Sequence, residues 1–420
     1  MAKNQEVQTD AVVDVDFSFV RVPKKARTRG FWSMFVIMLG FTFFSASMSV
    51  GARMANGLDF TGFLLAVILG GAILAVYTGA LGYIGSNTGM SLDLLCQRSF
   101  GTKGSYLPSA LISFTQIGWF GVGAAMFSIP VSEMLGINPW LLIIVIGIAM
   151  TASAYVGIKG IEIISFISVP LITILGTYSM FLALKEGGGF VAVFGRSTEG
   201  LSLFAAIAMV VGSFVSGGTA TPNFSRFAKT NKIAVATTVI AFYIGNTLMF
   251  FFGGVAGAFT GQEDIFYVMI AQGLTIPAVI VLGANIWTTN DNALYTGGLG
   301  LANITKYKKR PMTIVAGIVG TVAALWLYDN FVGWLSVLNA TLPPVGAIIV
   351  ADYFMRKEAY EAEADKDLKK VNWFAVAGVV AGAVVGNFVT WGIAAINAMV
   401  VSVIIYLIGH FIQKKSRAAA

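Results

Sequence analysis

The chain has 420 residues, of which 57% are hydrophobic and only 11% are charged, and 48 of them are glycines. This composition excludes an ordinary water-soluble domain and predicts an integral membrane protein whose helices pack closely through small residues. One cysteine and one histidine exclude an intrachain disulfide and a zinc or haem site, and the net charge of +7 lies in short loops rather than in a basic nucleic-acid-binding domain.

Long stretches without Asp, Glu, Lys or Arg predict where the chain crosses the bilayer, because about 20 helical residues span its hydrocarbon core. The first ten stretches cover 30–52, 60–92, 104–132, 134–158, 163–184, 200–225, 233–262, 265–290, 311–328 and 330–351. The stretch 371–413 is long enough for two helices, with a turn near Trp391 and Gly392. We therefore predict an all-α membrane protein with twelve transmembrane helices, the eighth continuing past Asp291 toward Asn303.

The distribution of Lys and Arg predicts the orientation of these helices. With the N-terminus inside, 24 of the 27 basic residues fall in inner segments, and only Arg53, Lys185 and Arg196 fall outside. By the positive-inside rule both termini are then cytoplasmic. The N-terminal residues show no apolar run with a cleavage site, which disfavours a signal peptide. We expect a cytoplasmic tail over 1–29, one transmembrane domain over 30–413 and a second cytoplasmic tail over 414–420.

Clusters of glycine, serine and proline within the spans predict interrupted helices. They occur at 40–47 in the first span, 212–219 in the sixth and 342–346 in the tenth. Backbone groups left unpaired in lipid are costly unless they line a cavity or bind something. Because the first and sixth spans are five helices apart, we expect a 5+5 inverted repeat, typical of secondary transporters, with two helices appended. Each cluster alone is also explained by close helix packing or a proline kink.

A polar group on the eighth span predicts a site for a monovalent cation. Asn285, Thr288 and Thr289 have the spacing i, i+3 and i+4, so they share one helix face. Together with carbonyls freed at the first break, such as those of Gly40 and Phe43, their oxygens could replace the hydration shell of sodium. A proton path would instead need carboxylates or histidines, and Asp291 is the only acidic residue deep within a span. Threonine bonding to its own helix is the alternative interpretation.

The segment 115–120 at the centre of the third span predicts an aromatic binding site. Trp119 lies in mid-membrane, whereas tryptophans usually gather at the interfaces, and Gln116 precedes it by three residues on the same face. With Phe214 in the sixth span, they predict a planar, neutral, polar substrate, since stacking on an aromatic ring contributes about 1–3 kcal/mol per base. Core packing of Trp119 with an interhelical amide bond is the alternative.

Five segments of the chain resemble the first nucleobase-cation symporter family and, within it, the bacterial cytosine permeases. The segments are 40–48, 115–123, 212–227, 285–295 and 342–353. The resemblance implies a leucine-transporter-like fold in the bacterial inner membrane and sodium-coupled import of cytosine by alternating access. It implies no enzymatic activity, no cofactor other than the coupling ion, no nucleic acid and no obligate protein partner. Proton coupling, another nucleobase, hydantoin or allantoin as substrate, and a channel remain alternatives.

The resemblance also implies roles for individual residues. The implied substrate-binding residues are Gln116, Trp119, Ser213, Phe214, Ser216, Asn285 and Asn290. Trp119 and Phe214 would sandwich the pyrimidine, and Gln116 would bond its polar edge. The implied sodium ligands are the hydroxyls of Thr288 and Thr289 and the carbonyls of Gly40, Phe43 and Asn285.

Overall fold

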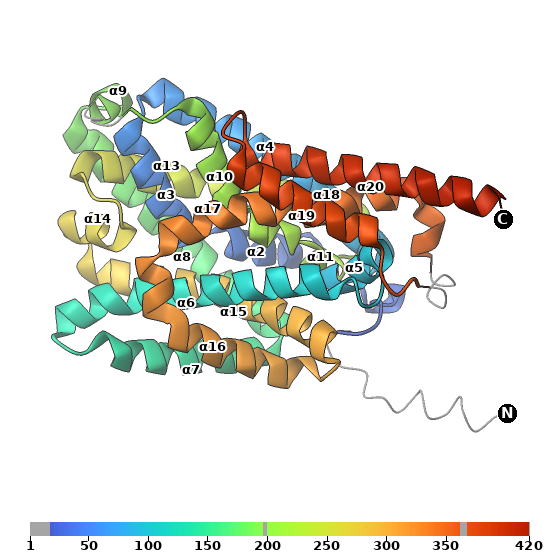
Figure 1. The fold of residues 1–420 in the computed structure, drawn as a ribbon. Helices are drawn as coiled ribbons and strands as arrows, with labels where there is room; N and C mark the ends of the chain where they lie inside the picture. Colours follow the sequence, from blue (N-terminus) through green and yellow to red (C-terminus); the bar gives the residue numbers. More distant parts are fainter. Residues whose placement is uncertain (1–16, 196–199, 362–367, 420) are drawn as a thin grey trace.

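The computed structural model describes residues 17–195, 200–361 and 368–419, and within these ranges the chain forms a bundle of helices (Figure 1). The first five predicted spans correspond to α2 with α3 (Phe31–Thr42, Ser45–Gly57), α4 (Phe60–Thr88), α6 (Tyr106–Leu135), α7 (Pro139–Val156) and α8 (Ile158–Gly187). The next five correspond to α10 with α11 (Leu203–Thr219, Pro222–Ser225), α12 with η2 and α13 (Asn231–Val239, Ile240–Gly245, Asn246–Thr260), α15 (Thr275–Thr305), α16 (Lys309–Asp329) and α17 with α18 (Phe331–Thr341, Pro343–Met355).

The last two spans are α19 (Trp373–Phe388) and α20 (Ala394–Ala419), joined by the predicted turn around Gly392. The helices between spans are η1 (Lys24–Ala26), α5 (Leu92–Phe100), α9 (Phe190–Phe194), α14 (Ile265–Ala271) and η3 (Lys357–Tyr360). In the described part of the chain, eight helices are long and apolar enough to cross a membrane, and the bent pair α2–α3 makes a ninth. The remaining predicted spans are the polar-centred α15, the two-part α17–α18 and the shorter α19, so each of the twelve contains helix.

The interruption predicted in the first span is confirmed. Helices α2 and α3 meet at an angle of 51°, and Phe43 and Phe44 between them have extended backbone conformations. The N–H of Phe43 still donates to the Leu39 carbonyl at 2.7 Å, while the N–H of Ser47 donates to Phe44 at 2.9 Å. The carbonyl groups at the break therefore lose their regular helical N–H donors, and these carbonyls lie in the middle of the bundle.

The interruption predicted at 212–219 in the sixth span is wrong in its position. Helix α10 continues through Thr219, and the irregular residues are Ala220 and Thr221, which precede Pro222 at the start of α11. The glycines permit close packing instead: a Cβ on Gly217 would lie 2.6 Å from the Phe214 ring, and one on Gly218 would lie 2.7 Å from Thr78. Small residues alone therefore do not distinguish a helix break from a tight helix contact.

One irregularity in the seventh span has no counterpart among the predictions. A π-helical segment, η2, lies between α12 and α13, and its last residue, Gly245, packs against α2. A Cβ on Gly245 would lie 2.6 Å from Leu39 and 3.1 Å from Phe43. The extra residue per turn thus lies beside the break in the first span, and such insertions are frequent at functional sites.

The two predicted tails are more ordered near the bundle than expected. From Phe17 onward the N-terminal segment packs on the helices: the N–H of Val22 donates to the Gly89 carbonyl at 2.8 Å, and Arg27 donates to the Ser86 carbonyl at 2.7 Å. At the other end, α20 continues through Ala419, so the predicted tail over 414–420 begins as helix. Arg196, predicted on the outer side, lies outside the described residues.

The buried Asp93 side chain on α5 should make the stability of the folded protein depend measurably on pH. Burial raises the pKa of its carboxyl to about 6, although the Ser109 hydroxyl donates to it at 2.5 Å. Because this pKa lies above the ordinary value of 3.8, the folded protein binds the proton more tightly than the unfolded chain does. The resulting stabilisation is present at low pH and is lost as the pH rises from about 4 to 6. In thermal melts over this range, Asp93→Asn should show a flatter dependence of the unfolding temperature on pH than the unmodified protein, and equal slopes would contradict the assignment.

Candidate functional site

The break between α2 and α3 faces the centre of α15. Asn285 on α15 bridges it, because its Nδ2 donates to the Phe43 carbonyl and its Oδ1 accepts from the Ser45 hydroxyl at 3.1 Å. Gly40 allows the close approach: a Cβ at this position would lie 2.3 Å from Ser165 Oγ and 2.7 Å from Thr288 Cγ2. The sequence thus brings the irregular backbone of the first span against the polar face of the eighth.

Three carbonyl oxygens converge on the hydroxyl of Thr289. Its Oγ1 lies 3.3 Å from the Gly40 oxygen, 3.3 Å from the Phe43 oxygen and 3.5 Å from the Asn285 oxygen. One hydroxyl proton can satisfy only one of these acceptors at a time, and of the three only the Phe43 oxygen is described above with another side-chain donor, Asn285 Nδ2. The site is buried and has more oxygen lone pairs than hydrogen-bond donors. Such an arrangement of neutral oxygens suits a monovalent cation.

The neighbouring hydroxyls come from α15 and α8. Thr288 Oγ1 lies 3.0 Å from the carbonyl of Ala284, to which it donates, and it is also hydrogen-bonded to the Ser168 hydroxyl. The buried Ser165 hydroxyl, close to Gly40, has no hydrogen-bond partner in the structure. The five predicted ligand residues therefore lie together, with two serines of α8 beside them. Among the described residues, no cluster of three or more His, Cys, Asp or Glu side chains offers an alternative metal site.

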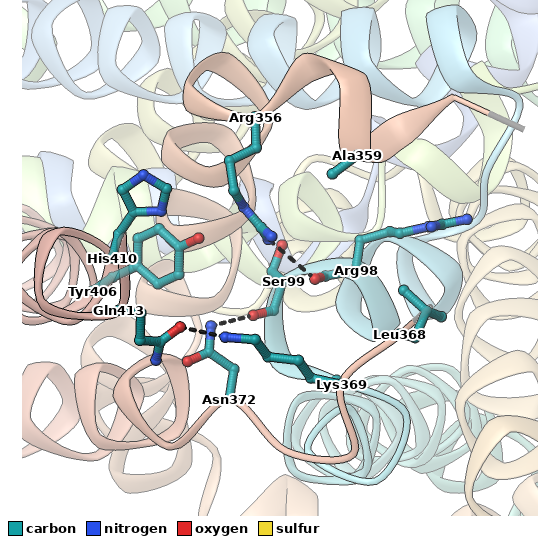
Figure 2. A pocket seen from close by; sticks show the side chains of 11 residues that line it. Arg98, Ser99, Arg356, Ala359, Leu368, Lys369, Asn372, Tyr406, His410 and Gln413 are labelled. Carbon is teal, nitrogen blue, oxygen red and sulfur yellow. Dashed lines mark hydrogen bonds between the residues drawn. The ribbon is translucent and has the colours of Figure 1, made fainter. Parts of the chain in front are cut away.

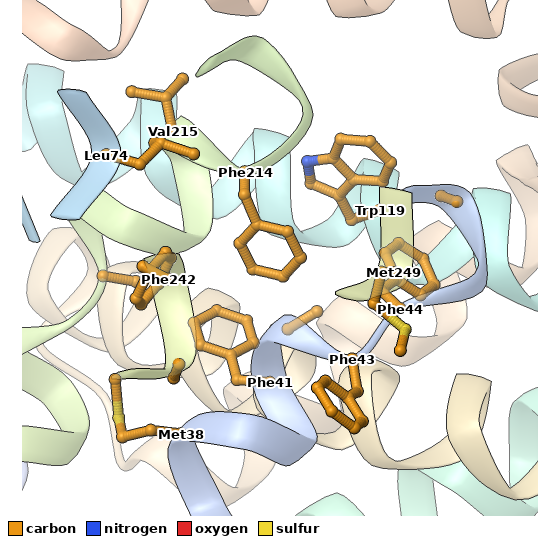
Figure 3. Close-up of a cluster of buried hydrophobic side chains, with 14 of the residues drawn as sticks. Met38, Phe41, Phe43, Phe44, Leu74, Trp119, Phe214, Val215, Phe242 and Met249 are labelled. Carbon is orange, nitrogen blue, oxygen red and sulfur yellow. The ribbon is translucent and has the colours of Figure 1, made fainter. Parts of the chain in front are cut away.

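Aromatic and polar side chains surround a cavity next to this oxygen cluster. Its lining residues are Phe41, Phe44, Gln116, Trp119, Ser213, Phe214, Ser216, Gly217, Thr289 and Ala293. Figure 3 shows the rings of Phe41, Phe44, Trp119 and Phe214 gathered around the same space. The volume of the cavity is about 10 Å³, which is room for about one water molecule. A nucleobase therefore fits only after some of these rings move apart.

The polar atoms at this cavity are unevenly satisfied. Trp119 Nε1 donates to the Ser216 hydroxyl at 2.9 Å, and the Ser213 hydroxyl donates to the Val210 carbonyl of its own helix at 2.8 Å. The Nε2 group of Gln116 is buried and has no hydrogen-bond partner. An unmade hydrogen bond of a buried amide costs about 1–3 kcal/mol, which a ligand with a suitable acceptor would recover.

Two of the seven predicted substrate residues do not line the cavity. Asn285 is engaged at the break of the first span, as described above. Asn290 points toward α6 and α7, where its Nδ2 donates to the Phe120 carbonyl at 3.1 Å and to Met150 Sδ at 3.2 Å. The other five residues, Gln116, Trp119, Ser213, Phe214 and Ser216, are brought together around it.

Three further aromatic residues belong to the site and were not predicted in this role. Phe41 lies near the end of α2 and Phe44 lies in the break, and the Phe44 ring meets Trp119 edge-on with a centroid distance of 5.6 Å. The ring of Trp334 on α17 also meets Trp119 edge-on, with a centroid distance of 5.1 Å. We found no sequence signal for Trp334, whose ring fills the space beside Gly118: a Cβ at this glycine would lie 2.2 Å from the ring.

Asp291 lies near these residues but belongs to a different contact. Its Oδ1 accepts from the Ser153 hydroxyl of α7 at 2.7 Å, and Ser153 accepts from Trp287 Nε1 at 2.8 Å. Asp291 does not line the aromatic cavity, so the carboxylate is engaged within the α7–α15 interface. Its other oxygen, Oδ2, is buried and has no hydrogen-bond partner in the structure.

A second polar cavity, of about 210 Å³, lies where α5, α18 and α20 meet (Figure 2). Its cationic side chains hold protein groups: Arg356 donates to both Asp352 and the Arg98 carbonyl, and Lys369 donates to Gln413. Beneath it, the fully buried Asp352 carboxylate also accepts from Tyr360 at 2.7 Å and from Tyr406. This network fastens α20 to α18 and η3.

Removal of the Asp352 carboxylate should destabilise this end of the protein. In Asp352→Ala, the tyrosine hydroxyls and Arg356 lose a shared acceptor, and breaking a buried pair in this way costs on the order of 3 kcal/mol. The expected result is a lower unfolding temperature in detergent, measured by differential scanning fluorimetry. The exposed Asp329, substituted by alanine, serves as the control and should leave the temperature unchanged. Equal temperatures for the two variants would contradict the assigned role.

A family profile described as "Permease for cytosine/purines, uracil, thiamine, allantoin" matches residues 21–409. The chain belongs to this family. It is therefore a multi-pass membrane transporter and not an enzyme. It is 48% identical over 408 residues to the cytosine permease of Escherichia coli strain K12, with 97% of each chain covered.

Solved structures with low sequence identity share the fold of this permease. Mhp1, a nucleobase-cation-symport-1 family transporter in a closed conformation with bromovinylhydantoin bound, superposes with a TM-score of 0.82 at 18% identity, covering 94% of this chain and 95% of that one. A Na⁺-coupled sialic acid symporter in a substrate-bound outward-open state gives a TM-score of 0.71 at 15% identity, covering 92% of this chain and 90% of that one. The leucine-transporter-like architecture expected from the sequence is confirmed.

Proposed function

We propose that this permease is a secondary active symporter that imports cytosine into a bacterial cell together with sodium, by alternating access. The relative that is 48% identical over nearly its whole length is named a cytosine permease, which supports the choice of substrate. The uncharged donors and aromatic rings of the cavity suit a planar neutral base. The oxygen cluster at the break supports sodium rather than a proton as the coupling ion.

The single observation that carries this proposal is the position of Thr289. Its side chain lines the aromatic cavity and also touches the Gly40 and Phe43 carbonyls at the break. An ion bound at these oxygens would fix α2 against α15 and so hold Phe41 and Phe44 at the cavity wall. Sodium and cytosine would then each raise the affinity for the other, because coupling between two binding sites is reciprocal.

The proposed membrane arrangement follows the sequence-based expectations. Residues 30–413 form one transporter domain in the inner membrane. In it α2–α8 and α10–α18 are two inverted repeats, α19 and α20 are appended, and both ends of the chain are cytoplasmic.

Trp119 and Phe214 would hold the pyrimidine between them, and Gln116 Nε2 would donate to its carbonyl oxygen or ring nitrogen. Each sodium ion that enters across 100 mV would supply about 2.3 kcal/mol toward accumulation of the neutral base.

The Thr289→Ala variant tests the link between ion and substrate. The affinity for cytosine should fall most at low sodium concentration, and it should recover partly at high sodium, because the variant keeps the carbonyls and loses one ligand. Thr289→Ser retains the hydroxyl and is the matched control. Isothermal titration of purified protein with cytosine over a series of sodium concentrations measures this. An equal loss of affinity at every sodium concentration would refute the assignment.

The competing interpretations are separated by transport in reconstituted vesicles. Saturable uptake of labelled cytosine that requires an inward sodium gradient supports the proposal, whereas uptake driven equally by a proton gradient in sodium-free buffer would show proton coupling. Flux that never saturates would indicate a channel. If unlabelled purines, hydantoin or allantoin competed better than unlabelled cytosine, the substrate would be that compound and not cytosine.

A further inference from the structure

A groove between α7 and α16 opens on the outside of the bundle, away from the transport site. The two helices lie side by side at one edge of the molecule (Figure 1). The groove has a volume of about 560 Å³, within the usual range of small-molecule sites. Its walls include Ile148 of α7 and Ile318 and Val322 of α16, which are 65%, 59% and 70% exposed. In a membrane protein these side chains face the acyl chains of lipid.

The floor of the groove is made by two matching pairs of glycine and threonine. A Cβ on Gly147 would lie 2.3 Å from Thr321 Oγ1, and a Cβ on Gly317 would lie 2.1 Å from Thr151 Oγ1. Each threonine hydroxyl donates to the carbonyl four residues earlier, Thr151 to Gly147 at 2.6 Å and Thr321 to Gly317 at 2.7 Å. The hydroxyls are therefore satisfied within their own helices, and the floor presents mainly methyl and methylene groups. Such a surface favours an apolar chain over a polar ligand.

The length of the groove matches one leaflet of a bilayer. Along α7 its lining extends from Ile144 to Tyr155, about 16 Å of helix at about 1.5 Å per residue. Half of a hydrocarbon core is about 15 Å thick. One acyl chain of a lipid in a single leaflet would therefore run along the groove from end to end.

Positive charge is concentrated at one end of the groove. The Arg310 guanidinium lies 5.1 Å from the centroid of the Tyr155 ring, which is itself part of the lining. Arg310 is exposed and takes part in no ion pair among the described residues, and Lys308 and Lys159 are exposed near the same helix ends. Basic pockets between transmembrane helices on the cytoplasmic side bind anionic lipid headgroups. This end is on the proposed cytoplasmic side.

We propose that the α7–α16 groove is a specific site for one anionic phospholipid, with an acyl chain along the glycine–threonine floor and the headgroup phosphate at Arg310. The phosphate and the guanidinium can form two parallel hydrogen bonds, and Tyr155 closes the groove below the headgroup. Bound lipid would hold α7 and α16 together and so support α6 and α15, against which they pack and which carry Trp119 and Thr289.

Native mass spectrometry of the purified full-length chain tests this site, with phosphatidylglycerol and phosphatidylcholine of the same acyl length as probes. The unmodified protein should retain one phosphatidylglycerol in preference to phosphatidylcholine. Ala152→Phe should abolish retention, because Ala152 lines the groove and is exposed, so the added ring fills it. Val145→Phe adds the same ring at an exposed position of α7 outside the groove and should retain the lipid.

The Arg310→Gln variant separates the headgroup from the acyl chain. It should weaken binding of phosphatidylglycerol about fivefold, since one basic residue near anionic lipid contributes about 1 kcal/mol, and weaken binding of phosphatidylcholine less, because the choline cation offsets the charge of its phosphate. Equal retention of the two lipids by the unmodified protein would overturn the proposal, as would undiminished retention in Ala152→Phe. A second copy of the chain that dissociates only in Ala152→Phe would overturn it in favour of a dimer interface. This test has no transport readout, so its failure is independent of the proposed cytosine transport.

Discussion

Replacement of Trp119 by alanine is expected to reduce cytosine affinity by roughly 5- to 150-fold, because stacking on an aromatic side chain contributes about 1–3 kcal/mol per base. The indole lines the cavity from α6, contacts the rings of Phe44 and Trp334, and donates to the Ser216 hydroxyl through its Nε1 group. The alanine variant would lose the stacking plane and release a polar group at the cavity wall. Equilibrium binding of labelled cytosine to the purified protein in saturating sodium measures the loss.

Two further variants control for a general effect on the helices. Trp119→Phe keeps an aromatic face but removes the donor to Ser216, so its affinity should lie between those of the alanine variant and the unmodified protein. Trp287→Phe removes an indole that bonds Ser153 on the other side of α15, and it should leave cytosine affinity unchanged. Similar losses in Trp119→Ala and Trp287→Phe would mean that the cavity on α6 is not the substrate site.

Substitution of Gly40 by alanine should lower the apparent affinity of transport for sodium more than any substitution at the surface does. The added Cβ would lie 2.3 Å from Ser165 Oγ and 2.7 Å from Thr288 Cγ2, so α2 must move away from α8 and α15. This movement displaces the Gly40 carbonyl from Thr289. Overpacking a tight contact costs about 1–3 kcal/mol, so the sodium concentration that gives half-maximal uptake should rise by roughly 5- to 150-fold.

Gly30 provides the matched control for this variant. It is the N-cap of the same helix, α2, and a Cβ there would meet no atom within 4 Å. Uptake by Gly30→Ala should therefore keep the sodium dependence of the unmodified protein. If Gly40→Ala also kept it while folding normally, the oxygen cluster at the break would not be the coupling site.

The sequence predicted the first break and the polar face of the eighth span well because several signals agreed there, although that span begins at Thr275 and residues 265–271 form a separate helix, α14. Hydroxyl and glycine residues at 40–47 coincide with the extended Phe43 and Phe44, and Asn285, Thr288 and Thr289 lie on the face that meets them. At 212–219 the same residue types serve contacts with Thr78 and between aromatic rings, and the helix continues. Local composition predicts that two helices pack closely. Whether the helix is interrupted depends on the residues that pack against it.

The candidate cavity was predictable only in part. Gln116 and Trp119 were identified from residue types that are unusual in mid-membrane, and Phe214 from its place in the glycine–serine cluster of the sixth span. The direction of Asn290, in contrast, depends on Phe120 and Met150 of neighbouring helices. Trp334 reaches Trp119 from α17, more than two hundred residues later in the chain. The Trp334 ring occupies the space left by the missing side chain at Gly118, and a glycine in the sequence does not indicate which residue occupies the space beside it.

If the proposed site holds the base, the small volume enclosed by Phe41, Phe44, Trp119 and Phe214 would also separate transported substrates from inhibitors. A flat base that is thin enough for the rings to close on both of its faces can be released on the far side. An analogue with a bulky substituent would enter while the rings are apart and then prevent their return. Such a compound would occupy the permease without crossing the membrane, and tight binding would accompany loss of transport.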